Sequence, residues 1–233
     1  MVERLCSGAS ADGEGQLAEA QRDVREHQLR QQSSAFALFR GLPCDAQLSE
    51  ADGVVLFRSF SAVRSKYRCP KGAKGYYELE IVEVTSYPQF GFASAAFKSM
   101  QGATSDGVGN NSASWAVDGV RKLKWHKGRT QTQAFECTWQ AGDVVGLACD
   151  LVNMRILVSL NGSFDPPNGV VFELASNDGV QDGLFAAFNC GSGRVLCNLG
   201  RARPFRHAPP GDDFKAFAHL NDAGAEGWSV LSR

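Results

Sequence analysis

The sequence contains no two cysteines at C-x-x-C spacing, and no two of its histidines stand at H-x-x-x-H spacing. Zinc ribbons and thioredoxin-like redox sites need the first spacing, and a common class of zinc enzymes needs the second. No cluster of carboxylates accompanies any of the four histidines, His27, His126, His207 and His219. We therefore predict no metal site and no cofactor, and we expect His126 to end a strand rather than to act as a base.

Long apolar runs are also absent. None approaches the roughly 20 residues that a membrane-spanning helix needs. The N-terminal stretch MVERLCSGASADGEG lacks the apolar core of a secretory signal peptide. The seven cysteines are an odd number, and Cys137, Cys149 and Cys197 lie within apolar strand patterns, where a free thiol packs as a small hydrophobe. We expect a soluble, reduced protein, cytoplasmic or otherwise intracellular, without membrane insertion.

Neither sign of charge is in excess, because 24 Lys and Arg face 25 Asp and Glu. This balance gives no electrostatic reason to expect nucleic acid as a partner. Catalytic motifs are missing as well. Residues 107–112 resemble a phosphate-binding loop but have no P-loop lysine, and residues 191–193 lack the full nucleophile-elbow pattern. The sequence therefore predicts a protein that is not an enzyme.

The chain is rich in glycine and phenylalanine, with 25 Gly, 15 Phe and 43% hydrophobic residues. This composition allows a substantial core and many tight turns. Residues 143–150 are apolar on both faces, which is typical of a central strand covered above and below. Residues 155–160 alternate, and Asn161-Gly162 closes this pair with the dipeptide best suited to a tight hairpin turn.

Further strands are predicted at 53–57, 75–84, 89–93, 114–119, 122–126, 133–139, 170–174, 184–189 and 194–199, with a bulge near Ile81. The strands at 114–119 and 122–126, and those at 184–189 and 194–199, are predicted to form hairpins. No helix separates these strands, so they indicate an all-β fold, an antiparallel β-sandwich. The basic segment 61–74 is predicted to be a solvated loop, with a phosphate-binding patch as the alternative.

We predict three parts: residues 1–47, a poorly ordered start followed by a helix at 16–32 and a connector; residues 48–208, the sandwich; and residues 209–233, a C-terminal tail packing on it. Phe36, Leu38, Phe39 and Leu42 are expected to dock the connector on the sandwich. The helix has a narrow apolar stripe, which leaves open a lightly packed helix or a weakly self-associating coiled coil. Phe205, Phe214 and Phe217 are the expected anchors of the tail.

Six segments in order resemble the SPRY domain family: GYYELEI, FGFA, VGNNSASWAVDG with KWH, WQAGDVVGLACDL, ILVSLNG and GLFAAFNCGSGRVLCNLG. The resemblance covers about 125 residues and leaves residues 1–45 out. Most of these landmarks are suited to structural roles. Trp115 and Trp139 can bury large areas, Asp143 and Asp150 can bond turn amides, and Gly146 allows a close approach.

The resemblance implies a non-catalytic module, and hence a possible adaptor, that binds a partner protein or short peptide through the loops at one rim of the sandwich. Members that bind an Asn-containing peptide use an Arg before the first matched strand, a role open to Arg64, Arg68 or the neighbouring Tyr67. Their Tyr and Leu ahead of the Ser-Trp pair, and the Trp of a late loop, have no counterpart at 104–107 and 190–193. That peptide specificity is therefore not expected here.

We name six candidate contacts on this rim: Arg64, Tyr67, Arg68, Phe97, Met100 and Asn189. Phe97 and Met100 lie in the long loop after residue 93, where burial beneath the loop is the alternative to a partner contact. A second hypothesis is a lectin-like carbohydrate-binding sandwich, in which an exposed Trp125 would stack on a sugar ring.

Overall fold

A computed structural model describes residues 36–38, 46–49, 53–97, 107–128, 133–175 and 179–220. All of them belong to one compact unit, residues 35–233. The helix predicted at 16–32 lies outside the described residues. Within the described residues, the model has no helix with the length and hydrophobicity needed to cross a bilayer.

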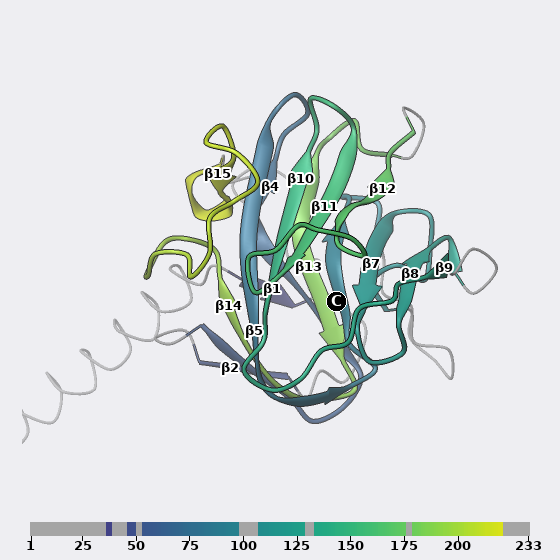
Figure 1. The fold of residues 1–233 in the computed structure, drawn as a ribbon, viewed down its shortest axis with the longest axis vertical. Helices are drawn as coiled ribbons and strands as arrows, with labels where there is room; N and C mark the ends of the chain where they lie inside the picture. The colour runs from purple at the N-terminus through teal and green to yellow at the C-terminus, as the bar shows by residue number, and fades with distance from the viewer. Residues whose placement is uncertain are drawn as a thin grey trace, which may run out of the picture. The chain divides into compact units, whose positions relative to one another are not determined.

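Two sheets form the molecule (Figure 1). The first sheet has the order β1 (Phe36–Leu38), β4 (Ser61–Cys69), β13 (Leu184–Cys190), β6 (Gln89–Ala93), β7 (Ser114–Asp118), β8 (Leu123–His126) and β9 (Gln133–Ala134). The second has the order β12 (Gly169–Glu173), β11 (Arg155–Leu160), β10 (Val144–Asp150), β5 (Lys74–Ser86), β14 (Ser192–Asn198), β3 (Val54–Phe57) and β2 (Ala46–Ser49). These strands all pair antiparallel, and only β15 (Lys215–Ala216) runs parallel to its neighbour β5. The predicted all-β antiparallel sandwich is confirmed.

The central pair of strands follows the sequence pattern closely. Every residue of β10 is buried, and β10 pairs with β11 from Val145 opposite Leu160 to Asp150 opposite Arg155. Asn161 and Gly162 both have positive φ, 51° and 84°, in the tight turn that follows β11. The expected bulge near Ile81 is also present, because Arg194 pairs with Glu83 while Val195 pairs with Ile81.

Aromatic side chains from both sheets fill the space between them. Tyr77 of β5 meets Phe92 of β6 edge to face with ring centroids 5.5 Å apart. Trp139 stacks on Phe90 at 4.9 Å. Trp115 is fully buried in the same core. These contacts join the inner faces of the two sheets and bury most of the large side chains.

Three local expectations were wrong. Residues 61–69 are not a solvated loop but strand β4, since Ala62 and Val63 are buried and the strand pairs with both β1 and β13. Only residues 133 and 134 of the predicted strand 133–139 are extended as β9. Strands β13 and β14 form no hairpin, because the chain changes sheets at Gly191 between them. In addition, the connector, expected to dock on the sandwich, contributes strands β1 and β2, which extend the two sheets.

Each sheet also has a covered outer face. Residues 107–113 lie over the first sheet, where Val108 and Phe97 pack on the alanines of β4, β6, β7 and β13. The segment 199–214 lies over the second sheet, where Phe205 and Phe214 pack around Tyr76. The C-terminal segment then enters the core, because Phe217 is fully buried. Both outer faces of the sandwich are therefore partly covered.

Candidate interaction surface

Three of the six candidate contacts are buried. Phe97 is 2% exposed and packs among Ala93, Val108 and Trp125. Arg64 is 8% exposed on β4, with its guanidinium carbon 4.3 Å from the centroid of the Phe185 ring. Burial lowers the pKa of this guanidinium from its ordinary value. Phe97 is therefore buried beneath the loop, which was the alternative to a partner contact. Arg64 lies inside the fold rather than at a rim.

Asn189 has a structural role in a buried polar network. Its Oδ1 accepts a hydrogen bond from the backbone N–H of Val108 at 2.7 Å. Its Nδ2 donates to Oε1 of Gln89 at 3.0 Å, and Gln89 donates in turn to Asn110 at 2.8 Å. The network ties the loop segment 107–110 to strands β6 and β13, and it leaves no part of Asn189 exposed.

The remaining candidates are not gathered at one place. Tyr67 and Arg68 are half-buried near the end of β4, and the Tyr67 hydroxyl accepts a hydrogen bond from Arg201 at 3.0 Å. Met100 lies outside the described residues. Asn189 is near the opposite end of the first sheet, where it pairs with Gln89. The five described candidates therefore do not form one rim, and exposed residues gather on a different surface.

That surface lies where the turns β5–β6, β7–β8 and β13–β14 meet. We call it the turn face and define it by the exposed or partly exposed residues Ser86, Tyr87, Val120, Arg121, Gly191 and Ser192. Tyr87 and Val120 are 57% and 46% exposed, two of the largest apolar exposures among the described residues. Ser86 and Ser192 join two of the turns through their hydroxyls at 2.9 Å.

Tyr87 is held in an unusual conformation. Its φ is 50°, a left-handed value that costs a non-glycine residue about 1–2 kcal/mol. The carbonyl of Ser86 accepts a hydrogen bond from the N–H of Gly191 at 2.7 Å, and the Tyr87 carbonyl accepts one from Asn189. A Cβ on Gly191 would meet Ser86 and the Tyr87 ring, so glycine is needed there. These contacts hold an aromatic ring at the surface.

Arg121 is the charged group of the turn face. Its guanidinium carbon lies 5.2 Å from the Tyr87 ring centroid and 4.4 Å from that of Trp125. Its Nε forms an ion pair with Asp118, which is fully buried and also accepts the N–H groups of Val120 and Arg121. Burial raises the pKa of Asp118, and the hydrogen bonds and charge of Arg121 act in the opposite direction.

The turn that carries Arg121 packs tightly against aromatic side chains. Gly119 packs directly against the indole of Trp139, where a Cβ would overlap the ring. Trp125 lies beneath Arg121 and is only 7% exposed. The lectin-like hypothesis required an exposed Trp125 to stack on a sugar, and the burial of this side chain removes that premise.

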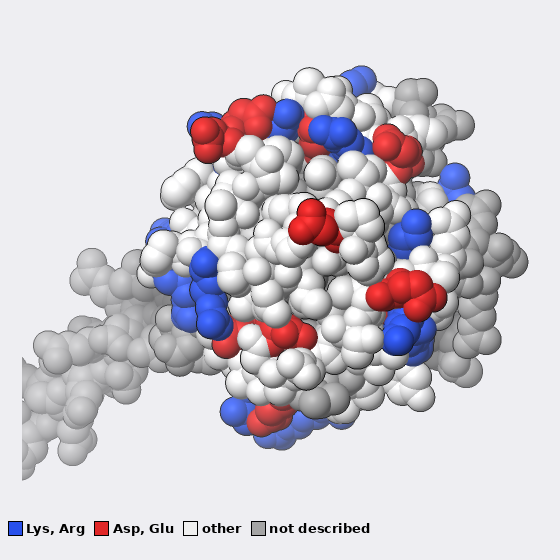
Figure 2. Space-filling view, viewed as in Figure 1, with Lys and Arg blue, Asp and Glu red and all other residues white. Residues whose placement is uncertain are grey.

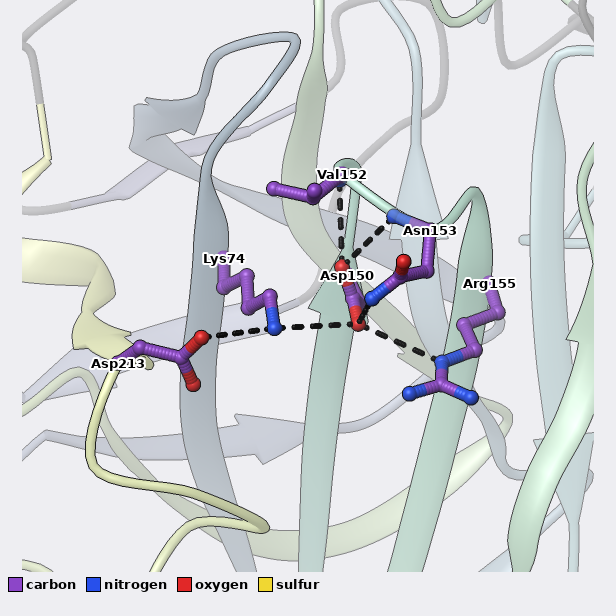
Figure 3. Close-up of polar contacts among 6 residues, drawn as sticks. All are labelled: Lys74, Asp150, Val152, Asn153, Arg155 and Asp213. Atoms are coloured by element: carbon purple, nitrogen blue, oxygen red, sulfur yellow. Dashed lines mark hydrogen bonds and ion pairs between the residues drawn. The ribbon is translucent and has the colours of Figure 1, made fainter.

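A second polar cluster lies at the other end of the sandwich (Figure 3). The buried carboxylate of Asp150 accepts hydrogen bonds from the N–H groups of Val152 and Asn153 and from the Asn153 side chain. Arg155 and Lys74 complete the shell at 3.4 and 3.5 Å. Lys74 also contacts Asp213 at 2.7 Å, which links the C-terminal segment to β5.

This cluster is a structural clamp rather than a binding site. Burial favours the protonated form of Asp150, but the hydrogen bonds from Asn153 and the charges of Lys74 and Arg155 outweigh it and lower the pKa. The hydrogen bond to Asp213 and the two nearby carboxylates raise the pKa of Lys74. Every oxygen of Asp150 is engaged, as the turn-bonding role expected from the sequence requires.

Charge does not single out a docking area on the face shown in Figure 2, where blue and red groups are interspersed. The turn face was missed in the sequence because its members are scattered over three turns. One feature of the sequence does point to this surface. Tyr87-Pro88 comes soon after the long predicted strand 75–84, and this tyrosine is not part of the apolar alternation that marks core residues. Asp118 through Arg121 resembled an ordinary hairpin turn.

The comparisons with known proteins agree with this architecture. The SPRY domain family model matches residues 74–201. The E3 ubiquitin-protein ligase RKP of Arabidopsis thaliana is 32% identical over 157 residues, 67% of this chain, and the chain spans only 11% of that relative. The SPRY domain of human HERC1 superimposes with a TM-score of 0.50 at 13% identity, covering 66% of this chain and 91% of the other, which shows a shared fold.

Proposed function

Because the chain belongs to the SPRY domain family, we propose that it binds a partner protein or short peptide through the turn face, as a non-catalytic adaptor. SPRY domains are generally protein-interaction modules. That general role is what family membership supports. The surface used, and the adaptor role, are our proposal.

The observation that carries the proposal is the exposure of Tyr87 on a strained turn. Residues held at unfavourable backbone angles cluster at functional sites, where the surrounding structure maintains them. Tyrosine and arginine are enriched among the residues that dominate binding energy at protein interfaces. Tyr87 is presented with Arg121 against its ring, and Val120 adds apolar area beside them. The turn face thus combines an aromatic anchor, an arginine and a rigid base.

The relative RKP carries a ligase activity in its name, but the matched region is 11% of that protein. We therefore propose binding for this chain and assign it no catalytic step. Two further expectations belong to the same proposal. The protein acts in the cytoplasm or elsewhere inside the cell, and the helix predicted at 16–32 allows weak self-association.

The test is affinity capture from the native cell lysate with quantitative mass spectrometry, using wild type, Tyr87→Asn and Val152→Asn. Asparagine tolerates positive φ, so Tyr87→Asn removes the ring while keeping the backbone. Val152 is a matched control, because it is 56% exposed near the Asp150 clamp and Tyr87 is 57% exposed. Surface changes of this kind alter stability by about 0.5 kcal/mol or less, which thermal unfolding verifies.

A partner should be captured equally by wild type and Val152→Asn. We expect the amount captured by Tyr87→Asn to be at least about tenfold lower. Equal capture by all three variants would refute the turn face as the binding surface. It would direct the search to Tyr67 and Arg68, the two half-buried candidates on β4.

A further inference from the structure

We propose that the turn face recognises a carboxylate, that of an Asp or Glu side chain next to an apolar residue, and that Arg121 is the residue that receives it. This inference rests on the proposed function and adds the chemistry of the partner. The proposed occupant is an acidic peptide segment, either a free chain end or an extended part of a folded partner.

One hydrogen-bond donor of the Arg121 guanidinium has no partner among the described residues. Nη2 of Arg121 is buried and has no hydrogen-bond acceptor anywhere in the described part of the chain, while Nε is engaged by Asp118. The indole Nε1 of Trp125, in the ring over which Arg121 lies, is buried and without an acceptor as well. Buried donors are normally paired, so two unpaired donors in contacting side chains indicate a missing acceptor.

The guanidinium of Arg121 is already oriented. The ion pair with Asp118 and the Trp125 ring beneath it hold it in place, so little rotamer freedom remains to be lost when a ligand binds and the Tyr87 ring moves aside. A planar guanidinium with one edge held by a buried carboxylate can still present its other nitrogens to a second one. A carboxylate is favoured over an amide because it adds an opposite full charge and can accept two parallel N–H bonds from a guanidinium.

The charge of the β7–β8 turn also favours a carboxylate. On the β7–β8 turn, the charged residues are Asp118, Arg121 and Lys122, which sum to one positive charge. Asp118 is fully buried and its oxygens already accept three hydrogen bonds, whereas Lys122 is exposed. The accessible charge of this turn is therefore positive, which favours an incoming carboxylate.

Arg121 is already partly accessible, and the side chain beside it is able to move. The Arg121 side chain is 30% exposed, and Tyr87, whose ring lies beside it, is more than half exposed. Exposed side chains change rotamer in picoseconds to nanoseconds, and such changes are common when partners bind. A shifted Tyr87 ring and the neighbouring Val120 would then contact the apolar residue of the segment.

The test uses the full chain and two pools of acetylated, amidated heptapeptides with randomised flanks. One pool has Leu-Glu at its centre and the other has the neutral isostere Leu-Gln. Binding is followed by NMR titration of the ¹⁵N-labelled protein. We expect the Leu-Glu pool to bind about tenfold more tightly than the Leu-Gln pool and to shift the amide signals of Val120 and Arg121.

The variants separate the charge from the fold. Arg121→Gln alone would leave Asp118 buried and unpaired, so the double variant Asp118→Asn/Arg121→Gln is used, in which the introduced side-chain carbonyl can still accept the turn amides. This variant is expected to bind both pools equally, and Val152→Asn should keep the preference. Equal binding of the two pools by wild type, or no binding of either pool, overturns the carboxylate inference.

Those failures remain distinct from a failure of the proposed function. If wild type shows no carboxylate preference but Tyr87→Asn still loses a cellular partner, the turn face binds by other chemistry. If Tyr87→Asn loses nothing, the proposed function itself fails.

Discussion

Phe97 and Tyr87 are two aromatic residues in turns or loops, and burial gives them opposite roles. Phe97 is packed on the outer face of the first sheet by residues 107–113, whereas Tyr87 is exposed and none of the described segments covers it. The alanines of β4, β6, β7 and β13 are small enough for the loop to approach the sheet. At the residue scale, the neighbours decide whether an aromatic ring stabilises the fold or is available to a partner.

The Phe97→Ala change tests this assignment. Removing a buried phenylalanine side chain costs about 3–5 kcal/mol of unfolding free energy, because apolar contacts are lost and a cavity remains. We expect urea unfolding to show a loss in this range, whereas the exposed control Val152→Ala should change the stability by about 0.5 kcal/mol or less. Similar stability for Phe97→Ala and the control would return Phe97 to the list of surface contacts.

At the scale of elements, β5 connects most of the molecule. It pairs with β10, β14 and β15, directs Tyr77 into the core and directs Glu78 to the outer face. The buried carboxylate of Glu78 accepts hydrogen bonds at 2.8 Å from the N–H groups of Arg206 and His207. Together with the Lys74–Asp213 ion pair, these bonds attach the segment 199–214 to the second sheet.

The Asp150 clamp at the start of β5 predicts a specific pH dependence. A carboxyl group whose pKa is lower in the folded than in the unfolded state stabilises the fold above its unfolded value. Here that ordinary value is 3.8, so the contribution is present at neutral pH and is lost as the pH falls through the lowered folded value. The pKa of Lys74 is raised above its ordinary value of 10.5. Its contribution to stability is therefore present below pH 10.5 and is lost only as the pH rises above that value.

The measurement compares wild type with Asp150→Asn in urea unfolding at a series of pH values. We expect Asp150→Asn to be less stable by about 1–3 kcal/mol at neutral pH, the usual cost of disrupting a buried hydrogen-bonded group. The difference should stay constant down to about pH 5 and shrink as the pH falls from there through 3.8 and below. A difference that stays constant across this range would contradict the assignment of the acid dependence to Asp150.

At the scale of the whole molecule, the domain extends beyond the residues that match the family model. The match ends at residue 201, but Phe217 is fully buried in the core, with its ring 5.5 Å from that of Tyr77 and 5.9 Å from that of Phe92. Strand β15 pairs with the beginning of β5 immediately before it. Residues 202–220 are therefore part of the folded unit.

A chain of residues 1–201 should consequently fail to reach the native state. Losing one buried phenylalanine already costs about 3–5 kcal/mol, a large part of the 5–15 kcal/mol that stabilises a typical domain. The truncation also removes Arg206 and His207, whose N–H groups bond Glu78, and Asp213, one of the two carboxylates that pair with Lys74. We expect the dispersed NMR amide spectrum to collapse for residues 1–201 and to persist for residues 1–220, which retain every described contact. A native spectrum for the shorter chain would show that the C-terminal segment is dispensable.

Much of the fold could be predicted from local patterns. The apolar run of β10, the alternation of β11 and the Asn161-Gly162 turn depend on side-chain period and backbone preference, which are properties of neighbouring residues. The sequence did not predict strand β4 because its Arg and Lys residues conceal a strand whose first five residues are buried, with Val63 in the core and Ala62 beneath the loop on the outer face. The β13–β14 hairpin was predicted wrongly because a short link between strands does not reveal whether the chain turns back or crosses to the other sheet.

The candidate site could be predicted much less well. The type of an amino acid indicates that it is able to bind a partner, but not whether another segment of the chain covers it. For this reason the prediction included three residues that are buried, Arg64, Phe97 and Asn189. Tyr87 follows β5, whereas Arg121 and Trp125 belong to the β7–β8 hairpin. The two segments meet only because β6 and β7 are neighbours and the chain passes from one sheet to the other between β5 and β6.

The sequence by itself determined the fold class, the family resemblance and most strand positions, because these depend on periodicity and turn chemistry within short windows. Only the tertiary structure decided which faces are covered, where the C-terminal segment enters the core and which turns combine at the surface. These features depend on contacts between residues far apart in the chain, whose free energy becomes apparent only when the two sheets are packed together.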